Sequence, residues 1–150
     1  MLVEDCQFEY NPTSTIYFSS NLRVIDGSYI HLFPEEDLIN NIAIISNIAL
    51  NYARDDLSLF SISLKKKYKK ETHESVIRQK LVHYFGGSES NYTFEKSFLI
   101  NKGTIKQQVG FFDQEKTSHG EYTVCGDYFE NGSIEGATIS GIKAYEQLKK

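Results

Sequence analysis

The sequence contains only two cysteines, Cys6 and Cys125, which lie near opposite ends of its 150 residues. Two thiols cannot form a disulfide framework or a four-thiolate metal site, so we expect both to be buried free thiols. The start MLVEDCQFEY has acidic residues where a secretory signal has a basic end and an apolar stretch. No apolar run approaches the length that spans a bilayer. We therefore expect a cytoplasmic protein without a membrane span.

The chain also has little net charge. The formal net charge is −4 and the one basic run is Lys65–Lys70, so the chain has no field that would hold a phosphate backbone. We expect no nucleic-acid partner, and we interpret the run as a solvated loop rather than an anion or membrane-surface patch. The four histidines are scattered. His73 and His83 fall on nearly opposite faces of a predicted helix, so no metal site is expected.

The composition is that of a folded domain, with 40% hydrophobic and 24% charged residues. No internal repeat, low-complexity stretch or linker divides the chain, so we expect one compact unit. Runs of β-branched and aromatic residues predict four strands in the first half. They are Thr15–Ser19, Ser28–Phe33, Ile42–Ser46 and Leu57–Leu64. Short turn-forming groups between them favour an antiparallel meander. In the last of these runs, apolar residues alternate with serines, although Phe60 breaks a strict period of two.

The period then changes to three or four residues and predicts a helix from about Glu71 to Phe85, capped by Thr72 and ended by Gly86-Gly87. The later elements are a strand at Tyr92–Ile100, a long connection over Gly103–Gly120, a strand at Tyr122–Cys125, a turn through Gly126–Gly132 and a helix from about Ser133 to Leu148. The fold class is α+β: a largely antiparallel sheet with one central helix and a C-terminal strand–turn–helix.

The C-terminal stretch VCGDYFENGSIEGATISGIKAYEQLKK concentrates small residues at the strand-to-helix turn and along the early helix. Glycine inside a helix costs about 1 kcal/mol relative to alanine, so Gly136 and Gly141 require a packing or ligand reason. A helix N-terminus presents unpaired N–H groups that stabilise an anion, or a ring that becomes anionic during a reaction. Asp127, at the end of the predicted strand, would add a carboxylate that accepts hydrogen bonds from cofactor hydroxyls.

This stretch resembles the C-terminal signature of the FAD-dependent amine oxidase, phytoene-desaturase-like and protoporphyrinogen-oxidase-like superfamily, in which G-D is followed by S-I-x-G-A-x-x-S-G. Upstream, LINNIAIISNIALNYARDDLSLFSISL is similar to part of the family's substrate domain. The resemblance implies that 1–120 form a substrate-domain-like sheet and helix, and that 121–150 contact FAD. Asp127 would contact the ribityl chain, and amides around Ile134, Glu135 and Gly136 would face the pyrimidine edge of the flavin. The implied cofactor-binding residues are Gly126, Asp127, Ser133, Ile134, Glu135, Gly136 and Ala137.

The sequence departs from the family in one large respect: no G-x-G-x-x-G follows a strand, so the element that binds the FAD pyrophosphate is missing. We expect the chain alone to hold FAD poorly or not at all. Two interpretations stay open. Either the chain is the C-terminal part of an oxidoreductase that takes a hydride from a small organic substrate and is completed by a separate FAD-binding polypeptide, or it is a flavin-free remnant. Such a remnant would act as an interaction or scaffold module and favour a homo-oligomer.

Two further groups of residues have a functional and a structural interpretation. Cys125 and His119 could form a nucleophile pair, but a free cysteine is more often a buried packing residue. Phe111-Phe112, Tyr128 and Phe129 could line a substrate or isoalloxazine pocket, and core packing explains them equally well. Neither group identifies a catalytic residue.

Overall fold

The computed structural model describes residues 9–24, 27–54, 56–107, 118–119 and 122–149. Contacts divide the chain into two units, one of Met1–Asn11 with Lys102–Lys150 and one of Pro12–Asn101. The sequence suggested one compact unit with segments 1–120 and 121–150. The roles expected of the two segments stay predictions.

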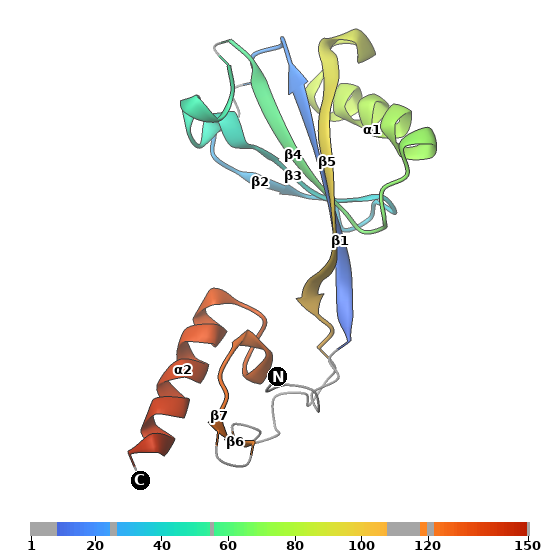
Figure 1. The fold of residues 1–150 in the computed structure, drawn as a ribbon. Coiled ribbons are helices and arrows are strands. Elements are labelled where there is room, and N and C mark those ends of the chain that lie inside the picture. Colours follow the sequence, from blue (N-terminus) through green and yellow to red (C-terminus); the bar gives the residue numbers. More distant parts are fainter. Residues whose placement is uncertain (1–8, 25–26, 55, 108–117, 120–121, 150) are drawn as a thin grey trace. The chain divides into compact units, whose positions relative to one another are not determined.

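The Pro12–Asn101 unit is built on a five-stranded sheet with the order β2-β3-β4-β1-β5 (Figure 1). The strands are β1 (Tyr10–Ser20), β2 (Ile30–Leu32), β3 (Ile39–Ile44), β4 (Ser58–Leu64) and β5 (Tyr92–Ile105). The pairings β1·β4, β2·β3 and β3·β4 are antiparallel. With the helix α1 (Lys70–Phe85) and the C-terminal helix α2 (Ile134–Leu148), the α+β class with a largely antiparallel sheet is confirmed.

The expected meander holds only for β2, β3 and β4. The first strand of the chain pairs with β4 instead of β2, with Ile16 opposite Ile62 and Phe18 opposite Phe60. This pairing places the apolar alternate residues of both strands on the same buried face. The short strand β2 forms one end of the strand order, with Leu32 71% exposed.

Strand β4 keeps a period of two in which Phe60 takes part, contrary to the interpretation from sequence. Phe60, Ile62 and Leu64 are buried, whereas Leu59 lies on the other face of the sheet. Ser58 is also buried on the Phe60 side, where its hydroxyl accepts a hydrogen bond from the amide of Val24 at 2.9 Å. A hydrogen-bonded serine can occupy a core position, so the apolar residues alone did not show that Ser58 and Phe60 share the buried face.

One face of the sheet is covered by α1, whose Ile77 and Leu81 are fully buried against Ile16, Phe18 and their neighbours. The helix lies where the spacing predicted it. Its N-cap is Lys69, without a side-chain cap, so the expected cap by Thr72 is wrong. Gly86 ends the helix with φ 83°, a conformation that glycine adopts readily.

The C-terminal part of the other unit contains two short strands and two helical segments. These are β6 (Ser118–His119), β7 (Tyr122–Thr123), the 3₁₀ turn η5 (Asp127–Phe129) and α2. The order strand, turn, helix agrees with the sequence prediction, and Ser133 is the N-cap residue of α2. Strand β5 continues to Ile105, five residues past the predicted end at Ile100. The middle of the predicted connection lies outside the described residues.

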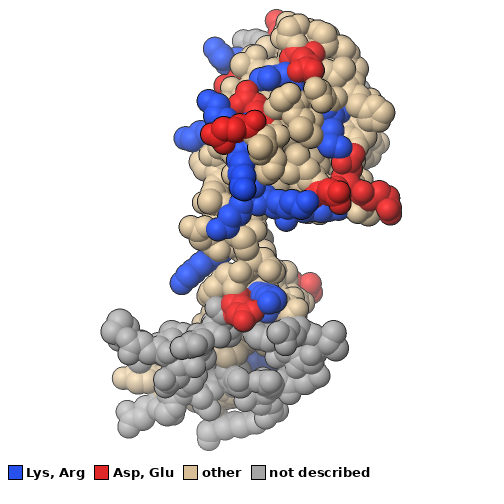
Figure 2. Space-filling model, turned by 90° about the vertical axis from the view of Figure 1, so that its right-hand side faces the viewer, with Lys and Arg blue, Asp and Glu red and all other residues tan. Residues whose placement is uncertain are grey.

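The surface carries charges of both signs. On the face in Figure 2, basic and acidic side chains are interspersed and form no continuous field of one sign. The lysines of the run Lys65–Lys70 are exposed between β4 and α1, as expected of a solvated segment. Lys65 also has a structural role, because its Nζ donates to the carbonyl oxygens of Phe33, Pro34 and Glu36 at 3.0, 2.8 and 2.6 Å. Among the described residues, no helix has the length and apolarity to cross a membrane.

Candidate functional site

The strand–turn–helix around α2 brings the sequence-predicted cofactor residues into one short stretch. Gly126 and Asp127 lie at the start of η5, and Ser133 to Ala137 form the first turn of α2. The amide of Gly126 donates to the hydroxyl of Ser140 at 3.1 Å, and Lys143 forms an ion pair with Glu130. The turn is thereby attached to the side of the helix at two points.

Asp127 is half-buried at the start of η5. Its main-chain oxygen accepts a hydrogen bond from the amide of Glu130 at 3.2 Å. Its carboxylate has no hydrogen-bond or ion-pair partner among the described residues. A partly sequestered carboxylate with free acceptor positions can bind the hydroxyls of a ligand. The carboxylate of Asp127 is therefore chemically suited to the predicted contact with the ribityl chain, and this contact stays a prediction.

The N-terminus of α2 uses part of its hydrogen-bonding capacity internally. The amide of Gly136 donates to the hydroxyl of Ser133 at 3.0 Å, and the amide of Ala137 donates to the carbonyl of Ser133 at 3.0 Å. The amides of Ile134 and Glu135 have no acceptor in the part of the chain that the structure describes. Two amides, rather than the three expected from the resemblance, thus remain available to an external acceptor at this end of the helix dipole.

The buried face of α2 consists of small residues spaced by four: Gly136, Ser140 and Ala144. A Cβ on Gly136 would lie 2.0 Å from the carbonyl oxygen of Asn131. The close approach that the glycine pattern predicts is therefore made, at this position, by the chain's own turn. The cofactor contact expected at the Gly136 backbone is not needed to explain why residue 136 is glycine.

Gly141 differs from Gly136, because a Cβ there would have no atom within 4 Å. On the same side of α2, exposed apolar residues recur at helical spacing. They are Ile134 (91% exposed), Ile142 (54%), Tyr145 (57%) and Leu148 (72%). We call these four residues the α2 stripe. The cost of a mid-helix glycine at 141 has no packing explanation among the described residues.

The sequence also suggested cysteines and aromatic residues as candidates, and the structure describes some of them. Cys125 is an exposed free thiol, not a buried one, because β7 ends at Thr123 and Cys125 falls in the following turn. Phe111-Phe112 and Cys6 lie outside the described residues. Tyr128 and Phe129 are half-buried and pack on each other with ring centroids 4.6 Å apart. Over the described part of the chain, no three histidine, cysteine or acidic side chains gather where a metal ion could be held.

A second candidate site lies within the Pro12–Asn101 unit, on residues that the sequence prediction missed. A groove of about 530 Å³ is lined by Tyr17, Ser19, Tyr52, Leu59, Glu95 and Phe98, among others. Tyr17 and Leu59 extend from β1 and β4 on the face of the sheet opposite the core. The ring of Tyr17 meets Phe98 edge-on at 5.9 Å, and Lys96 Nζ lies 4.9 Å from the Phe98 ring centre. The hydroxyl of Ser19 donates to Glu95 Oε1 at 2.5 Å.

The groove combines aromatic walls with three charged side chains, Arg54, Glu95 and Lys96. Apolar walls with a few polar groups are usual for a site that binds a small organic molecule. A signal for it was present in the alternation of TIYFS: if Ile16 and Phe18 face the core, Tyr17 and Ser19 must face the other way. Glu95 and Phe98 could not have been found in this way. They lie three residues apart in β5 and yet both contact outward-facing residues of β1, so the strand does not alternate regularly between them.

The sequence matches no protein-family model and no curated protein. The structure resembles two crystal structures. One is a protein from Pyrococcus furiosus, with TM-score 0.60 and 15% sequence identity, over 94% of this chain and 32% of that one. The other is an oxidoreductase from Methanosarcina mazei, with TM-score 0.62 and 13% identity, over 93% of this chain and 35% of that one.

At these identities the likeness shows a shared fold. The chain spans about a third of the length of the two proteins. The fold of this chain is thus found within a larger protein that is described as an oxidoreductase.

Proposed function

We propose that this chain is the C-terminal part of an FAD-dependent oxidoreductase of the amine oxidase or desaturase type. The observation that carries the proposal is the fold likeness to the Methanosarcina mazei oxidoreductase, of which this chain covers 35%. It agrees with the family resemblance of the C-terminal signature. On this proposal FAD, when bound, supplies a two-electron oxidation of a C–N or C–C bond in a small organic substrate.

The described residues suit one part of FAD. The half-buried carboxylate of Asp127 has free acceptor positions for ribityl hydroxyls, and the amides of Ile134 and Glu135 have free protons for a ring that becomes anionic on reduction. No glycine-rich fingerprint for the pyrophosphate occurs in the sequence. FAD binding would therefore require a nucleotide-binding part that lies outside these 150 residues.

The α2 stripe would be the surface that such a nucleotide-binding part covers. Four large apolar side chains exposed along one side of a helix are the pattern typical of an interaction surface. Gly141, with no atom near its Cβ position, leaves room beside them for a second backbone. The resembling proteins contain about two further thirds of chain from which such a part could come.

Flavin retention by the completed protein tests this proposal. The chain would be produced together with the polypeptide encoded next to it, or within its longer parent chain, and the bound flavin measured by absorbance after release. Asp127→Asn keeps the size of the side chain and removes the charge, so retention should fall. Glu146→Gln, an exposed acid near the other end of α2, is the matched control and should retain flavin fully.

A steric variant separates a flavin contact from a folding defect. Ala137 is exposed at the start of α2, so Ala137→Leu would obstruct an approaching ring without striking the chain's own turn. Flavin content unchanged in both Asp127→Asn and Ala137→Leu would refute the assignment of this site. Gly136 is unsuitable for the purpose, because any side chain there collides with Asn131.

The alternative, a flavin-free interaction module, is favoured by one observation. The contact between Asn131 and Gly136 explains the most prominent glycine of the motif by packing alone. On this alternative the α2 stripe would join two copies of the chain. A colourless protein that forms a stable dimer, and that takes up no flavin when the neighbouring polypeptide is supplied, would favour the module over the oxidoreductase.

A further inference from the structure

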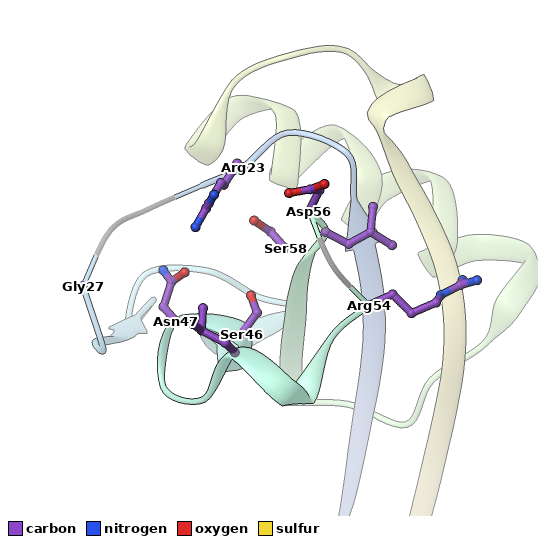
Figure 3. Close-up of a pocket in the computed structure, with 9 residues that line it drawn as sticks. Arg23, Gly27, Ser46, Asn47, Arg54, Asp56 and Ser58 are labelled. Carbon is purple, nitrogen blue, oxygen red and sulfur yellow. The ribbon is translucent and has the colours of Figure 1, made fainter.

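A second cavity, independent of the flavin proposal, lies within the Pro12–Asn101 unit at the N-terminal end of β4. Its volume is about 460 Å³. Arg23 borders it from the segment after β1, Ser46 and Asn47 from the 3₁₀ turn η1 (Ile45–Asn47), and Ser58 from the first position of β4. In Figure 3 the side chains of these four residues point toward a common space. We call this cavity the Arg23 pocket.

The two serines of the Arg23 pocket have hydroxyl protons that donate no hydrogen bond within the described residues. The hydroxyl of Ser46 accepts from the amide of Leu59 at 3.0 Å, and the hydroxyl of Ser58 accepts from the amide of Val24 at 2.9 Å. Each serine is more than nine-tenths buried, with 7% and 2% exposure, and neither hydroxyl proton has an acceptor among the described residues. A hydroxyl that already accepts a hydrogen bond has its proton free to donate.

Asn47 adds an unsatisfied donor. Its side-chain Nδ2 is buried and has no hydrogen-bond partner in the described part of the chain. A buried amide donor without a partner is costly and uncommon in native proteins. The exposed Arg23 likewise makes no ion pair or side-chain hydrogen bond with the described residues, so its guanidinium is available to a ligand. The four residues that point into the pocket therefore supply four sets of unused donors and one positive charge, that of Arg23.

We propose that the Arg23 pocket binds the carboxylate group of a small organic molecule. The planar guanidinium of Arg23 matches a carboxylate in a two-pronged pair. Asn47 Nδ2 and the two serine hydroxyls supply the remaining donors. Asp56 also lines the pocket, and Figure 3 shows its carboxylate at the opposite end from Asn47. The negative charge of Asp56 repels a dianion such as sulfate or a phosphate ester more strongly than a monoanion, so a monoanionic carboxylate fits the pocket better.

Binding would be measured by titrating the full chain with sodium propionate at constant ionic strength, observed by amide nuclear magnetic resonance. The amides of Leu59 and Val24 report directly, because each donates to a hydroxyl that would in turn donate to the ligand. Both should shift saturably, with a dissociation constant on the order of millimolar for so small a probe. The amide of Gly126, which donates to Ser140 in the other unit, is the internal control.

Two arginine variants separate a specific contact from general charge attraction. Arg23→Gln should weaken propionate binding by about tenfold or more, because it removes a charge-assisted pair. Since Arg23 is exposed, the fold should tolerate this change. Arg54→Gln removes the same charge from the rim of the pocket, but the guanidinium of Arg54 extends away from the other four side chains in Figure 3. It should change the affinity by less than about twofold.

Sodium sulfate and ethylammonium chloride complete the test. Weaker shifts with sulfate than with propionate, and none with ethylammonium, support a carboxylate site. The proposal is overturned if no probe shifts the Leu59 and Val24 amides saturably, if sulfate binds at least as tightly as propionate, or if Arg54→Gln weakens binding as much as Arg23→Gln. None of these outcomes depends on flavin, so a failure here is distinguishable from a failure of the proposed function.

Discussion

The carbonyl oxygen of Asn131 occupies the space beside Gly136 in which any larger residue would place its Cβ, at a distance of 2.0 Å. The turn that contains Asn131 is attached to α2 by the bond from Gly126 to Ser140 and by the ion pair between Glu130 and Lys143. Because the obstacle at Gly136 is backbone, a change of side-chain conformation cannot relieve it. The turn itself would have to move.

Gly136→Ala should therefore destabilise the strand–turn–helix by about 1–3 kcal/mol, the usual cost of overpacking. Gly141→Ala is the matched control, since a Cβ there meets nothing within 4 Å, and it should stabilise α2 by up to about 1 kcal/mol. Hydrogen exchange of the α2 amides measures the local stability of this element. Equal effects of the two substitutions would contradict the packing account of Gly136.

Ser133 caps α2, and removing its side chain should lower the protection of the α2 amides from hydrogen exchange. Its hydroxyl accepts a hydrogen bond from the amide of Gly136 at 3.0 Å. The same hydroxyl donates to Asn131 Oδ1, so Ser133→Ala removes both bonds and should cost about 1 kcal/mol. Ser133→Asp keeps the acceptor for the Gly136 amide but cannot donate to Asn131, so it should cost less than alanine. If alanine and aspartate protect the α2 amides equally well, the side-chain cap contributes nothing in solution.

The turn before β4 gives a third prediction. Asp56 has a φ of 68°, and the amide of Leu57 donates to the carbonyl of Arg54 at 3.1 Å. Aspartate tolerates this left-handed conformation better than most residues, glycine adopts it freely, and alanine does not. Asp56→Ala should be less stable than Asp56→Gly by about 1 kcal/mol in urea unfolding. An alanine variant as stable as the glycine variant would show that the turn relaxes to another conformation.

The sequence predicted helices and strands correctly where the periodicity was strong. Examples are α1 and the beginning of α2 at Ser133. Strand order could not be predicted in the same way. The pairing of Ile16 with Ile62 and of Phe18 with Phe60 depends on matching two apolar faces that lie more than forty residues apart in the chain. The cap by Thr72 was wrong because α1 begins two residues earlier, after Lys69, and the start of a helix depends on where the chain enters it from the preceding strand.

The candidate sites, too, depend on contacts between segments that are far apart in the sequence. The C-terminal motif could be located from its residues, but the reason for Gly136 required the position of Asn131. The Arg23 pocket was not predicted, because its donors come from three separate segments of the unit and two of them are serines. Serine is common in loops and edge positions, so Ser46 and Ser58 carry no signal until their burial and hydrogen bonds are known.

The pH dependence of stability gives the last prediction, through Glu36, whose carboxylate accepts hydrogen bonds from Lys80 and Tyr84 of α1. The bond from Lys80, followed by that from Tyr84, holds the pKa of Glu36 below its ordinary value of 4.5. The stability it contributes is therefore present above that value and is lost as the pH falls through the lowered pKa. Burial, followed by the bond to Glu36, raises the pKa of Tyr84 to about 12, so its contribution is lost as alkaline pH rises through that value.

Glu36→Gln should remove part of the acid sensitivity of the unfolding temperature, measured by circular dichroism from neutral pH to below the ordinary pKa of a glutamate. Tyr84→Phe should remove part of the alkaline loss of stability, because it deletes the hydroxyl that ionises more easily in the unfolded chain. Glu89→Gln, an exposed acid in the same unit, controls for the change in net charge. If Glu36→Gln and Glu89→Gln flatten the acid limb equally, the bonds to α1 have no specific effect, and general charge repulsion explains the acid unfolding.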